Sequence, residues 1–393
     1  MISYVDELAV KDKRVFIRAD FNVPLSPEGT ITDDNRIKST LPTITSVLDR
    51  GGSVILASHL GRPKGKADKQ YTLAPVATRL AELLGKKVIF LEDCVGKDVE
   101  EKARGLNPGD VVLLENLRFH PEEEKNDQGF AKRLAALADI YINDAFAVCH
   151  RAHASVEAIT RFCKEKGAGF LVKNEITYFN KALENPERPL AAIVGGAKVS
   201  GKLEVLENLL HTVDTILIGG GMAFTFLKAR GVDVGKSLVE MNLLDTARTI
   251  LEKAGKSGVV VILPVDCVVA EKIDATAEYK TTTVDAMPVD WMGLDIGPQT
   301  LALFKEALKD AKTIVWNGPM GVFELEPFSA GTYETIALVA DSPALSIVGG
   351  GDTGVALHRS GKAESISFIS TAGGAFLELL KGGTLPGIKA LDH

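Results

Sequence analysis

The sequence has few cysteines, no long apolar segment and no excess of basic residues. Its four cysteines, at positions 94, 149, 163 and 267, include no C-x-x-C pair, so neither a disulfide framework nor a zinc site is indicated and a reducing compartment is expected. No apolar run approaches the roughly 20 residues of a membrane span. The first residues, MISYVDELAVKDKR, have no apolar signal core. We therefore expect a soluble, cytoplasmic protein that does not bind a membrane.

Length and charge narrow the class of protein further. At 393 residues, the chain exceeds the size at which one hydrophobic core stops growing, so two domains are expected. The net charge of −7 argues against a nucleic-acid partner, although it allows a local basic pocket.

Short β-branched runs alternate with helical patterns, which is typical of an α/β fold with parallel sheets. The sequence predicts strands in RVFIRADF, SVILASHL, KVIFLED, VVLLENL and IYINDAF in the first half. In the second half it predicts strands in LAAIVGG, TILIGGG, VVVILPVD, TIVWNGP, LSIVGGG and SISFIS.

Between the two sets of strands, the sequence predicts a connecting helix over residues 171–188. Val172, Ile176, Phe179 and Leu183 are spaced 4-3-4 and form one apolar stripe, and prolines at 186 and 189 end the helix. We expect this hinge helix to join a lobe of residues 1–170 to a lobe of residues 189–370.

Basic and polar residues follow the predicted strands of the first half. In open parallel sheets, ligands bind outside the carboxyl ends of the strands, and the planar fork of arginine suits carboxylate or phosphate. These residues predict an anion pocket, although each could instead be paired with a local acid. They are Asp20, Asn22, His59, Arg62, Arg118, Arg151 and His153. His150 and His153 lack a carboxylate or cysteine set that would indicate a metal site.

Arg36 stands in the predicted first turn of a helix that Asp33, Asp34 or Asn35 can cap. A cation there opposes the helix dipole and costs about 0.3–1 kcal/mol when exposed. The arginine either forms a salt bridge with Asp33 or Asp34 or points at a ligand. We favour the ligand because the neighbouring strand ends also carry cations.

The strand ends of the second half are rich in glycine: VGGAKVSGK, IGGGMAF, WNGPMGVFE, VGGGDTGV and STAGGAF. Glycine lets a backbone approach phosphate closely, and a following helix N-terminus adds partial positive charge. Five such loops indicate a phosphorylated ligand. Lys198 and Lys202 would share one helical face if a helix begins there. Leu203 stands where a Walker loop needs Ser or Thr.

Asp352 decides between two kinds of nucleotide site. The spacing of Gly349, Gly351 and Gly354 fits the G-x-G-x-x-G turn of an NAD-dependent dehydrogenase. A bare carboxylate in that turn would repel a pyrophosphate, whereas Mg²⁺ is typically held by one or two carboxylates plus phosphate oxygens. A dehydrogenase also needs an acid about 20 residues downstream, and that position falls in STAGG. Asp352 therefore indicates a magnesium nucleotide. Glu324 could bind ribose hydroxyls or cap a helix.

An anion-binding lobe joined to a nucleotide lobe is the layout of a kinase whose lobes close. Arg36 and Lys202 are the expected cations at the transferred phosphoryl group, and an acceptor that is already a carboxylate would need no base. A two-lobed solute-binding protein that closes on an anion is the alternative. It would not explain the five glycine loops or Asp352.

The chain closely resembles the phosphoglycerate kinase family at RADFNVPL, ASHLGRPKG, ENLRF, NDAFAVCHRAHAS, VGGAKVSGK, WNGPMGVFE and VGGGDT, and as far as the LPGIKAL tail. The resemblance implies reversible phosphoryl transfer from 1,3-bisphosphoglycerate to ADP, giving 3-phosphoglycerate and ATP, with Mg²⁺ bound to the nucleotide. It also implies a monomer of two Rossmann-like lobes that close about the hinge, with residues 371–393 returning to the first lobe.

The same resemblance assigns roles to residues. Phosphoglycerate contacts are implied for Asp20, Phe21, Asn22, Arg36, His59, Leu60, Gly61, Arg62, Arg118 and Arg151, and phosphate contacts for Lys198 and Lys202. Nucleotide contacts are implied for Lys202, Gly219, Gly293, Asn317, Pro319, Glu324, Gly350, Gly351, Asp352 and Thr353, with Asp352 also holding the metal. Gly373 and Gly374 match the helix N-terminus that meets the transferred phosphate. Two residues depart from the family pattern: Ala372, where a glycine is common, and Gly201.

Overall fold

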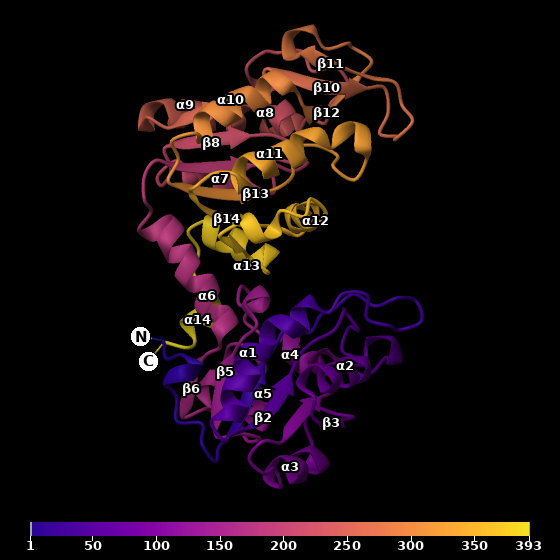
Figure 1. The fold of residues 1–393 in the computed structure, drawn as a ribbon, viewed down its shortest axis with the longest axis vertical. Coiled ribbons are helices and arrows are strands. Elements are labelled where there is room, and N and C mark those ends of the chain that lie inside the picture. The colour runs from indigo at the N-terminus through magenta and orange to yellow at the C-terminus, as the bar shows by residue number, and fades with distance from the viewer. Residues whose placement is uncertain (1, 393) are drawn as a thin grey trace. The chain divides into compact units, whose positions relative to one another are not determined.

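The computed structural model describes residues 2–392, and the chain divides into two compact units (Figure 1). Unit 1 comprises Met1–Ile176 and Thr384–His393, and unit 2 comprises Thr177–Gly383. Each unit contains a six-stranded sheet in which every pair of neighbouring strands is parallel. The α/β architecture expected from the sequence is therefore confirmed.

The sheet of unit 1 has the order β3-β4-β2-β1-β5-β6. Its strands are β1 (Arg14–Arg18), β2 (Ser53–Ala57), β3 (Val88–Leu91), β4 (Val111–Leu114), β5 (Ile140–Asn143) and β6 (Glu165–Ala168). The helices of this unit are α1 (Asn35–Asp49), α2 (Ala74–Leu84), α3 (Lys97–Arg104), α4 (Pro121–Glu124), α5 (Gln128–Ala135) and α14 (Pro386–Lys389). Every residue of β2, β4 and β5 is buried, because helices cover both faces of a parallel sheet.

The sheet of unit 2 has the order β15-β14-β13-β7-β8-β9. Its strands are β7 (Leu190–Val194), β8 (Thr215–Ile218), β9 (Val260–Ile262), β13 (Thr313–Asn317), β14 (Leu345–Gly349) and β15 (Phe368–Ile369). The helices are α7 (Leu203–Leu209), α8 (Ala223–Ala229), α9 (Leu244–Ser257), α10 (Pro298–Leu308), α11 (Ala330–Ala340), α12 (Gly351–Arg359) and α13 (Gly373–Leu380). An antiparallel sheet of order β11-β10-β12 is added, formed by β10 (Asp266–Ala270), β11 (Tyr279–Thr283) and β12 (Met292–Ile296).

All eleven runs that predicted strands contain strands, but four further strands were not expected. The β6 sequence EKGA and the β11 sequence YKTTT are mostly polar and carry no apolar alternation. The strand β10 begins at Asp266, the last residue of the predicted run VVVILPVD, because Pro264 separates it from β9. The antiparallel sheet was therefore missed.

The segment between the two sets of strands forms α6 (Phe170–Phe179), followed by a π-helical turn over Asn180–Glu184. The division between the units falls within α6, after Ile176. Of the expected apolar stripe, Val172 is buried, and the other three residues are half-buried. The chain from Thr384 onward lies with unit 1, where Lys166 Nζ donates to the carbonyl oxygen of Ala390 at 2.9 Å.

Among residues 2–392, no helix combines the length and the apolar character needed to cross a membrane.

Asp266 connects the antiparallel sheet to the N-terminus of α10. The carboxylate is fully buried and accepts hydrogen bonds from the backbone N–H groups of Gln299 (2.9 Å) and Thr300 (2.8 Å) and from Thr300 Oγ1 (2.7 Å). These donors belong to the first turn of α10, so Asp266 satisfies N–H groups that have no partner within the helix.

We expect Asp266→Ala to lower the free energy of unfolding of unit 2 by about 2–4 kcal/mol, because it removes three hydrogen bonds and leaves the backbone N–H groups of Gln299 and Thr300 without an acceptor. Both tryptophans, Trp291 and Trp316, lie in unit 2, so urea unfolding followed by tryptophan fluorescence measures this unit. Asp290→Ala, at a carboxylate that is 80% exposed, is the control and should change the midpoint little. Equal midpoints for the two variants would contradict the capping role.

Candidate active site

The strand ends that carry the expected anion-binding residues are neighbours in unit 1. The strands β4, β2, β1 and β5 are consecutive in the sheet, and their carboxyl ends share one edge because they are parallel. Asp20 and Asn22 follow β1, His59 and Arg62 follow β2, Arg118 follows β4 and Arg151 follows β5. The topology therefore brings these side chains to one edge of one sheet.

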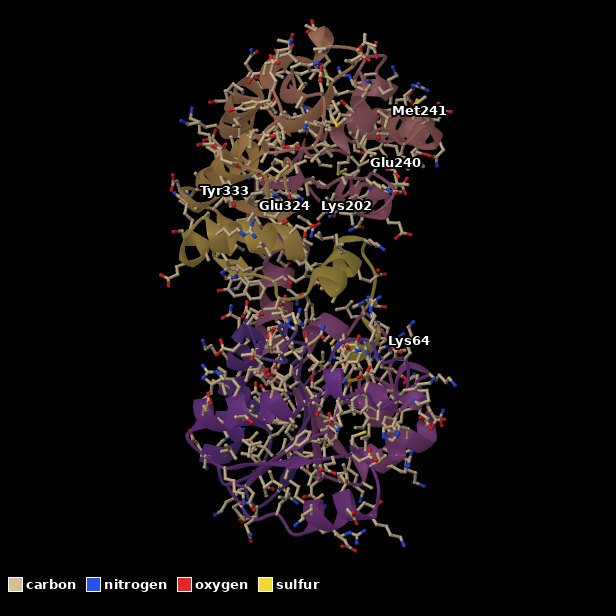
Figure 2. All side chains as sticks on the ribbon, turned by 90° about the vertical axis from the view of Figure 1, so that its right-hand side faces the viewer. Lys64, Lys202, Glu240, Met241, Glu324 and Tyr333 are labelled. Atoms are coloured by element: carbon tan, nitrogen blue, oxygen red, sulfur yellow. The ribbon has the colours of Figure 1, made fainter. Side chains whose placement is uncertain are left out.

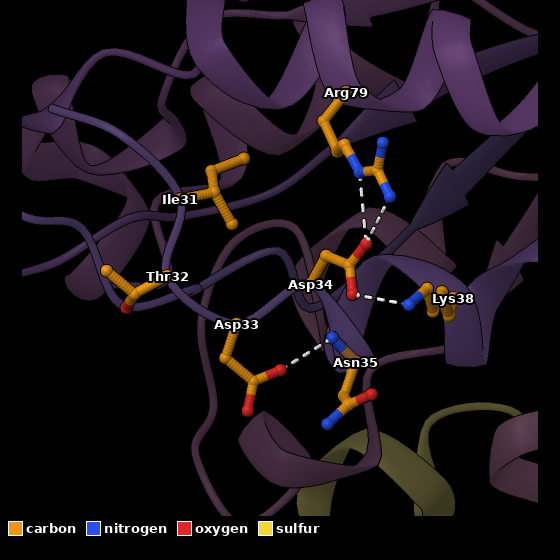
Figure 3. Close-up of a pocket in the computed structure, with 7 residues that line it drawn as sticks. All are labelled: Ile31, Thr32, Asp33, Asp34, Asn35, Lys38 and Arg79. Carbon is orange, nitrogen blue, oxygen red and sulfur yellow. Dashed lines mark hydrogen bonds and ion pairs between the residues drawn. The ribbon is translucent and has the colours of Figure 1, made fainter.

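Arg36, in the first turn of α1, pairs with the carboxylate of Asp20. It does not pair with Asp33 or Asp34, which were the alternative partners. Asp34 occupies the N-cap position of α1 without a side-chain capping bond. Its carboxylate instead pairs with Arg79 Nη2 and Lys38 Nζ, each at 2.8 Å (Figure 3).

The start of α1 lines a pocket of 670 Å³, and the polar side chains of this pocket hold it in place. Asp33 Oδ1 accepts the backbone N–H of Asn35 at 2.8 Å (Figure 3), and the ion pairs of Asp34 tie the same turn to α2. The charges of the pocket are therefore largely paired with one another. Arg36, the next residue after Asn35, does not pair with these pocket residues and pairs with Asp20, which lies after the end of β1.

Arg18 is a buried cation that the sequence argument missed. Its Nε donates to Ser155 Oγ at 2.8 Å, and its Nη2 lies 3.4 Å from His59 Nδ1. Ser155 Oγ in turn donates to the buried carboxylate of Glu123 at 2.6 Å. Arg18 lies within β1 rather than after it, so a search of strand ends does not reveal it.

Arg118 has hydrogen-bond donors that the protein leaves unmet. Its side chain is 5% exposed, and its Nη1 donates to the carbonyl oxygen of Gly61 at 2.8 Å. Its Nε and Nη2 are buried and have no hydrogen-bond acceptor within residues 2–392, although Glu124 Oε1 lies 3.3 Å from Nε as an ion pair. Buried donors of this kind are rare in folded proteins. A carboxylate or phosphate would satisfy them.

The two histidines of this edge are neutral at pH 7. Burial, together with the charges of Arg18, Arg118 and Arg36, holds the pKa of His59 well below its usual value. Burial and the charges of Arg18, Arg118 and Arg151 lower the pKa of His153 to about 3. These imidazoles therefore offer hydrogen bonds to an anion but add no charge to it.

The remaining expected residues of unit 1 shape the pocket edge. Asn22 Oδ1 accepts the backbone N–H of Gly61 at 2.8 Å and so joins the ends of β1 and β2. Phe21 and Leu60 are buried, which makes them supports of the edge rather than side-chain contacts. Arg62 is exposed, and Arg151 Nε donates to His150 Nε2 at 3.1 Å.

In unit 2 the glycine loops surround a cavity of 310 Å³. Four of the expected nucleotide residues line it: Gly293, Pro319, Glu324 and Asp352. Its walls also include apolar side chains that the sequence argument missed, namely Leu238, Ile273, Met292, Leu294 and Val322. Apolar walls with a few polar groups are typical of a small-molecule site. Met292 and Leu294 belong to β12, part of the sheet that was not expected.

Other expected residues of unit 2 hold the loops and do not line the cavity. Asn317 Nδ2 donates to the carbonyl oxygen of Gly349 at 2.9 Å, and Thr353 Oγ1 accepts the backbone N–H of Gly318 at 2.9 Å. Gly350 has a φ of +108°, which a side chain would strain. At Gly219, a Cβ would lie 2.4 Å from the sulfur of Met320. These four residues connect the ends of β8, β13 and β14.

Lys198 and Lys202 do not share a helical face, which corrects that expectation. The helix α7 begins at Leu203, with Lys202 as its N-cap residue, and the backbone N–H of Lys202 closes a turn onto the carbonyl oxygen of Val199 at 2.7 Å. Gly201 disfavours an earlier helix start. Lys198 is exposed, and Lys202 is half-buried. Figure 2 labels Lys202 together with Glu240 and Glu324 in unit 2.

Two helix N-termini come together beside this cavity. The helix α12 begins at Gly351 and α13 at Gly373, and a Cβ built on Gly373 would lie 3.7 Å from the backbone nitrogen of Gly351. Their unpaired N–H groups and aligned dipoles form an anion site. Ala372, the departure from the family pattern, has a φ of −117°, so this position does not require glycine.

Burial lowers the pKa of Lys202 to about 8, and the charge of Asp352 opposes this shift. The ammonium group of Lys202 is therefore near Asp352 and the N-terminus of α12. Unit 1 holds buried cations, one of which, Arg118, has unmet donors, and unit 2 holds a nucleotide-sized cavity beside two helix N-termini. Together these features define a phosphotransferase of small anions.

Comparisons with known proteins agree with this class. A family profile described as phosphoglycerate kinase matches residues 5–383. The chain is 60% identical to the phosphoglycerate kinase of Geotalea uraniireducens (strain Rf4), over 100% of this chain and 98% of that protein. It is 60% identical to the one from Geobacter metallireducens (strain ATCC 53774 / DSM 7210 / GS-15), over 100% and 99%. The structure of phosphoglycerate kinase from Coxiella burnetii matches with a TM-score of 0.93 at 45% identity, over 100% of this chain and 99% of that chain.

The chain therefore belongs to the phosphoglycerate kinase family. Family membership confirms the expected kinase activity, which is the phosphoryl transfer between 1,3-bisphosphoglycerate and ADP. The dehydrogenase and solute-binding alternatives are wrong.

We expect kcat/KM for MgATP to fall above about pH 8, because Lys202 of the free enzyme loses its proton near that pH. Lys202→Arg should remove this alkaline limb, whatever its effect on the absolute rate, because a guanidinium stays charged to well above pH 10. Lys236→Arg, at an exposed ion-paired lysine of the same unit, is the control. An alkaline limb that persists in Lys202→Arg would exclude Lys202 as its cause.

Proposed function

We propose that unit 1 binds 3-phosphoglycerate or 1,3-bisphosphoglycerate at the shared edge of β4, β2, β1 and β5. The unmet donors of Arg118 carry this proposal, because a phosphate or carboxylate would supply the missing acceptors. Arg62, with its exposed side chain, and Arg151 add charge, and neutral His59 adds a hydrogen bond. Further contacts come from Asp20, Asn22 and Gly61, while the buried Phe21 and Leu60 support this edge and offer only their backbone.

Unit 2 binds ADP or ATP in the 310 Å³ cavity. The apolar walls receive the base, and Glu324 accepts hydrogen bonds from ribose hydroxyls. The phosphates run toward the N-terminus of α12, where Gly350, Gly351 and Thr353 shape the loop. Gly219, Gly293, Asn317 and Pro319 set the positions of the surrounding strand ends.

Asp352 would hold Mg²⁺ together with phosphate oxygens of the nucleotide. The fit rests on a single exposed carboxylate at the N-terminus of α12, on the wall of the cavity. One carboxylate plus phosphate oxygens is a common magnesium ligand set. When bound, the ion neutralises phosphate charge.

Phosphoryl transfer then depends on placing cations around the transferred group. A carboxylate oxygen of 3-phosphoglycerate attacks the γ-phosphorus of ATP, the bond to the β-phosphate oxygen breaks, and no proton has to be removed from the acceptor. Arg36, Lys198 and Lys202 stabilise the developing charge, and the first N–H groups of α13, at Gly373 and Gly374, receive the transferred phosphate.

These groups belong to different units, so the reaction requires closure about the segment that contains α6. Closure also excludes water, which would otherwise accept the phosphoryl group. We further propose that the enzyme is a cytoplasmic monomer. The free state of all four cysteines supports a reducing compartment.

The wild-type chain should consume ATP only when 3-phosphoglycerate and Mg²⁺ are both present. Arg36→Ala should then lower kcat about 10²–10³-fold while changing KM for MgATP less than threefold, because the guanidinium acts on the transferring group. Lys38→Ala is the matched control from the same helix, since it removes an ion pair with Asp34 and should keep near wild-type kinetics. Equal losses in kcat and in MgATP affinity would exclude the role given to Arg36.

Asp352→Ala should raise the Mg²⁺ concentration for half-maximal activity, and KM for MgATP, at least about tenfold, because a magnesium ligand is lost. KM for 3-phosphoglycerate should change less than threefold. Asp341→Ala, at an exposed carboxylate of unit 2, is the control for the loss of surface charge. An unchanged magnesium dependence would remove Asp352 from the metal site.

A further inference from the structure

Three side chains of different chemistry meet beside the β3 edge of unit 1, outside the substrate and nucleotide sites. Asp93 and Cys94 follow β3, and His120 follows the 3-10 turn Leu117–Phe119 that comes after β4. One donor atom from each of the three lies within 4.8 Å of the others. The phosphoryl-transfer mechanism uses none of them.

Local contacts fix the orientation of two of these donors. His120 Nε2 lies 2.7 Å from Asp93 Oδ1, and the same oxygen accepts the backbone N–H of Cys94 at 2.6 Å. The imidazole of His120 is stacked on Phe130, with ring centroids 5.2 Å apart and planes inclined by 29°. The carboxylate and the imidazole therefore lie side by side before any ligand arrives, and the ion would replace the hydrogen bond between them.

We propose that Asp93, Cys94 and His120 form a binding site for a borderline-soft divalent cation, Zn²⁺ in particular, with water at the fourth position. One sulfur, one imidazole and one carboxylate are a donor set that suits Zn²⁺ or Co²⁺ and does not suit Mg²⁺. Donor atoms around tetrahedral zinc are about 3.3–3.8 Å apart. Binding would therefore bring the sulfur inward by up to about 1 Å from the 4.8 Å limit and move His120 Nε2 and Asp93 Oδ1, now 2.7 Å apart, away from each other by at least about 0.6 Å.

Access and charge balance agree with an open site. The side chains of Asp93 and His120 are 51% and 26% exposed, so an ion can enter from solvent, while the buried Cys94 closes the protein side. Binding replaces the S–H bond of Cys94 by a sulfur–metal bond and releases one proton to water. One thiolate and one carboxylate then neutralise the two positive charges of the ion, so the ion and its ligands together carry no net charge.

The surroundings of Cys94 favour the protonated thiol when no ion is bound. Burial, followed by the charges of Asp93 and Glu123, raises the pKa of Cys94 well above its usual value. Arg133 acts in the opposite direction. A bound cation supplies the positive charge that this thiolate lacks. The ion would also tether the segment after β3 to the segment that carries Arg118, two residues before His120.

Cobalt is the probe that tests this site, because a cobalt–thiolate bond absorbs in the near ultraviolet. The reduced full-length chain, freed of metal and without nucleotide, is titrated with Co²⁺. We expect one equivalent to bind with a sulfur-to-cobalt charge-transfer band that added Zn²⁺ removes. Cys94→Ser should abolish the band, and His120→Gln should weaken binding at least tenfold. Cys163→Ser, at the half-buried cysteine of the same unit, is the matched control and should leave the band unchanged.

Three results would overturn the proposal: no charge-transfer band up to 100-fold excess Co²⁺, a band lost in Cys163→Ser, or a band with unchanged affinity in His120→Gln. If Cys94→Ser does not fold, as judged by circular dichroism, Asp93→Asn takes its place. This variant should also weaken cobalt binding at least tenfold, and undiminished binding would contradict the assigned ligand set.

Discussion

Parallel strand order is the constraint on which both halves of the active site depend. Because neighbouring parallel strands all end at the same edge, a residue placed after one strand becomes the neighbour of residues placed after the next. In unit 1 this edge gathers cations from segments as distant in sequence as Arg18 and Arg151. In unit 2 it gathers the loops around Gly196, Pro319 and Asp352 at one cavity. Side chains more than a hundred residues apart thus work together without long connecting loops.

Concentrating so many cations at one edge of unit 1 has an electrostatic cost that the protein offsets locally. Arg36 is paired with Asp20, and the charge of Arg18 is linked through Ser155 to the buried Glu123. The histidines respond by remaining neutral, since both burial and the nearby guanidinium groups disfavour the imidazolium. Arg118 keeps two buried donors without a hydrogen-bond acceptor, although its charge lies beside Glu124, and these donors favour an anionic substrate.

The sequence could predict the strands and their polar ends, because apolar runs followed by charged or glycine-rich segments are local signals. It could not reveal which acid pairs with Arg36, since Asp20 is sixteen residues away and Asp34 adjoins the same turn. The sequence also did not predict the antiparallel sheet, because β11 is exposed and polar. The apolar cavity wall formed by Met292 and Leu294 of that sheet was therefore not predicted either. Arg18 was hidden for a different reason: a cation inside a buried strand resembles an ordinary strand residue until its partners are known.

The unmet donors of Arg118 also make the chain respond to its surroundings unevenly. A buried guanidinium with two donors that lack an acceptor weakens the native state of the unit that contains it, and any small dianion that accepts from these donors strengthens that unit alone. Unit 2 has a separate hydrophobic core and gains nothing directly from such an anion. In a cell whose metabolite concentrations fluctuate, the two halves of one polypeptide would therefore differ in how often each opens to proteases.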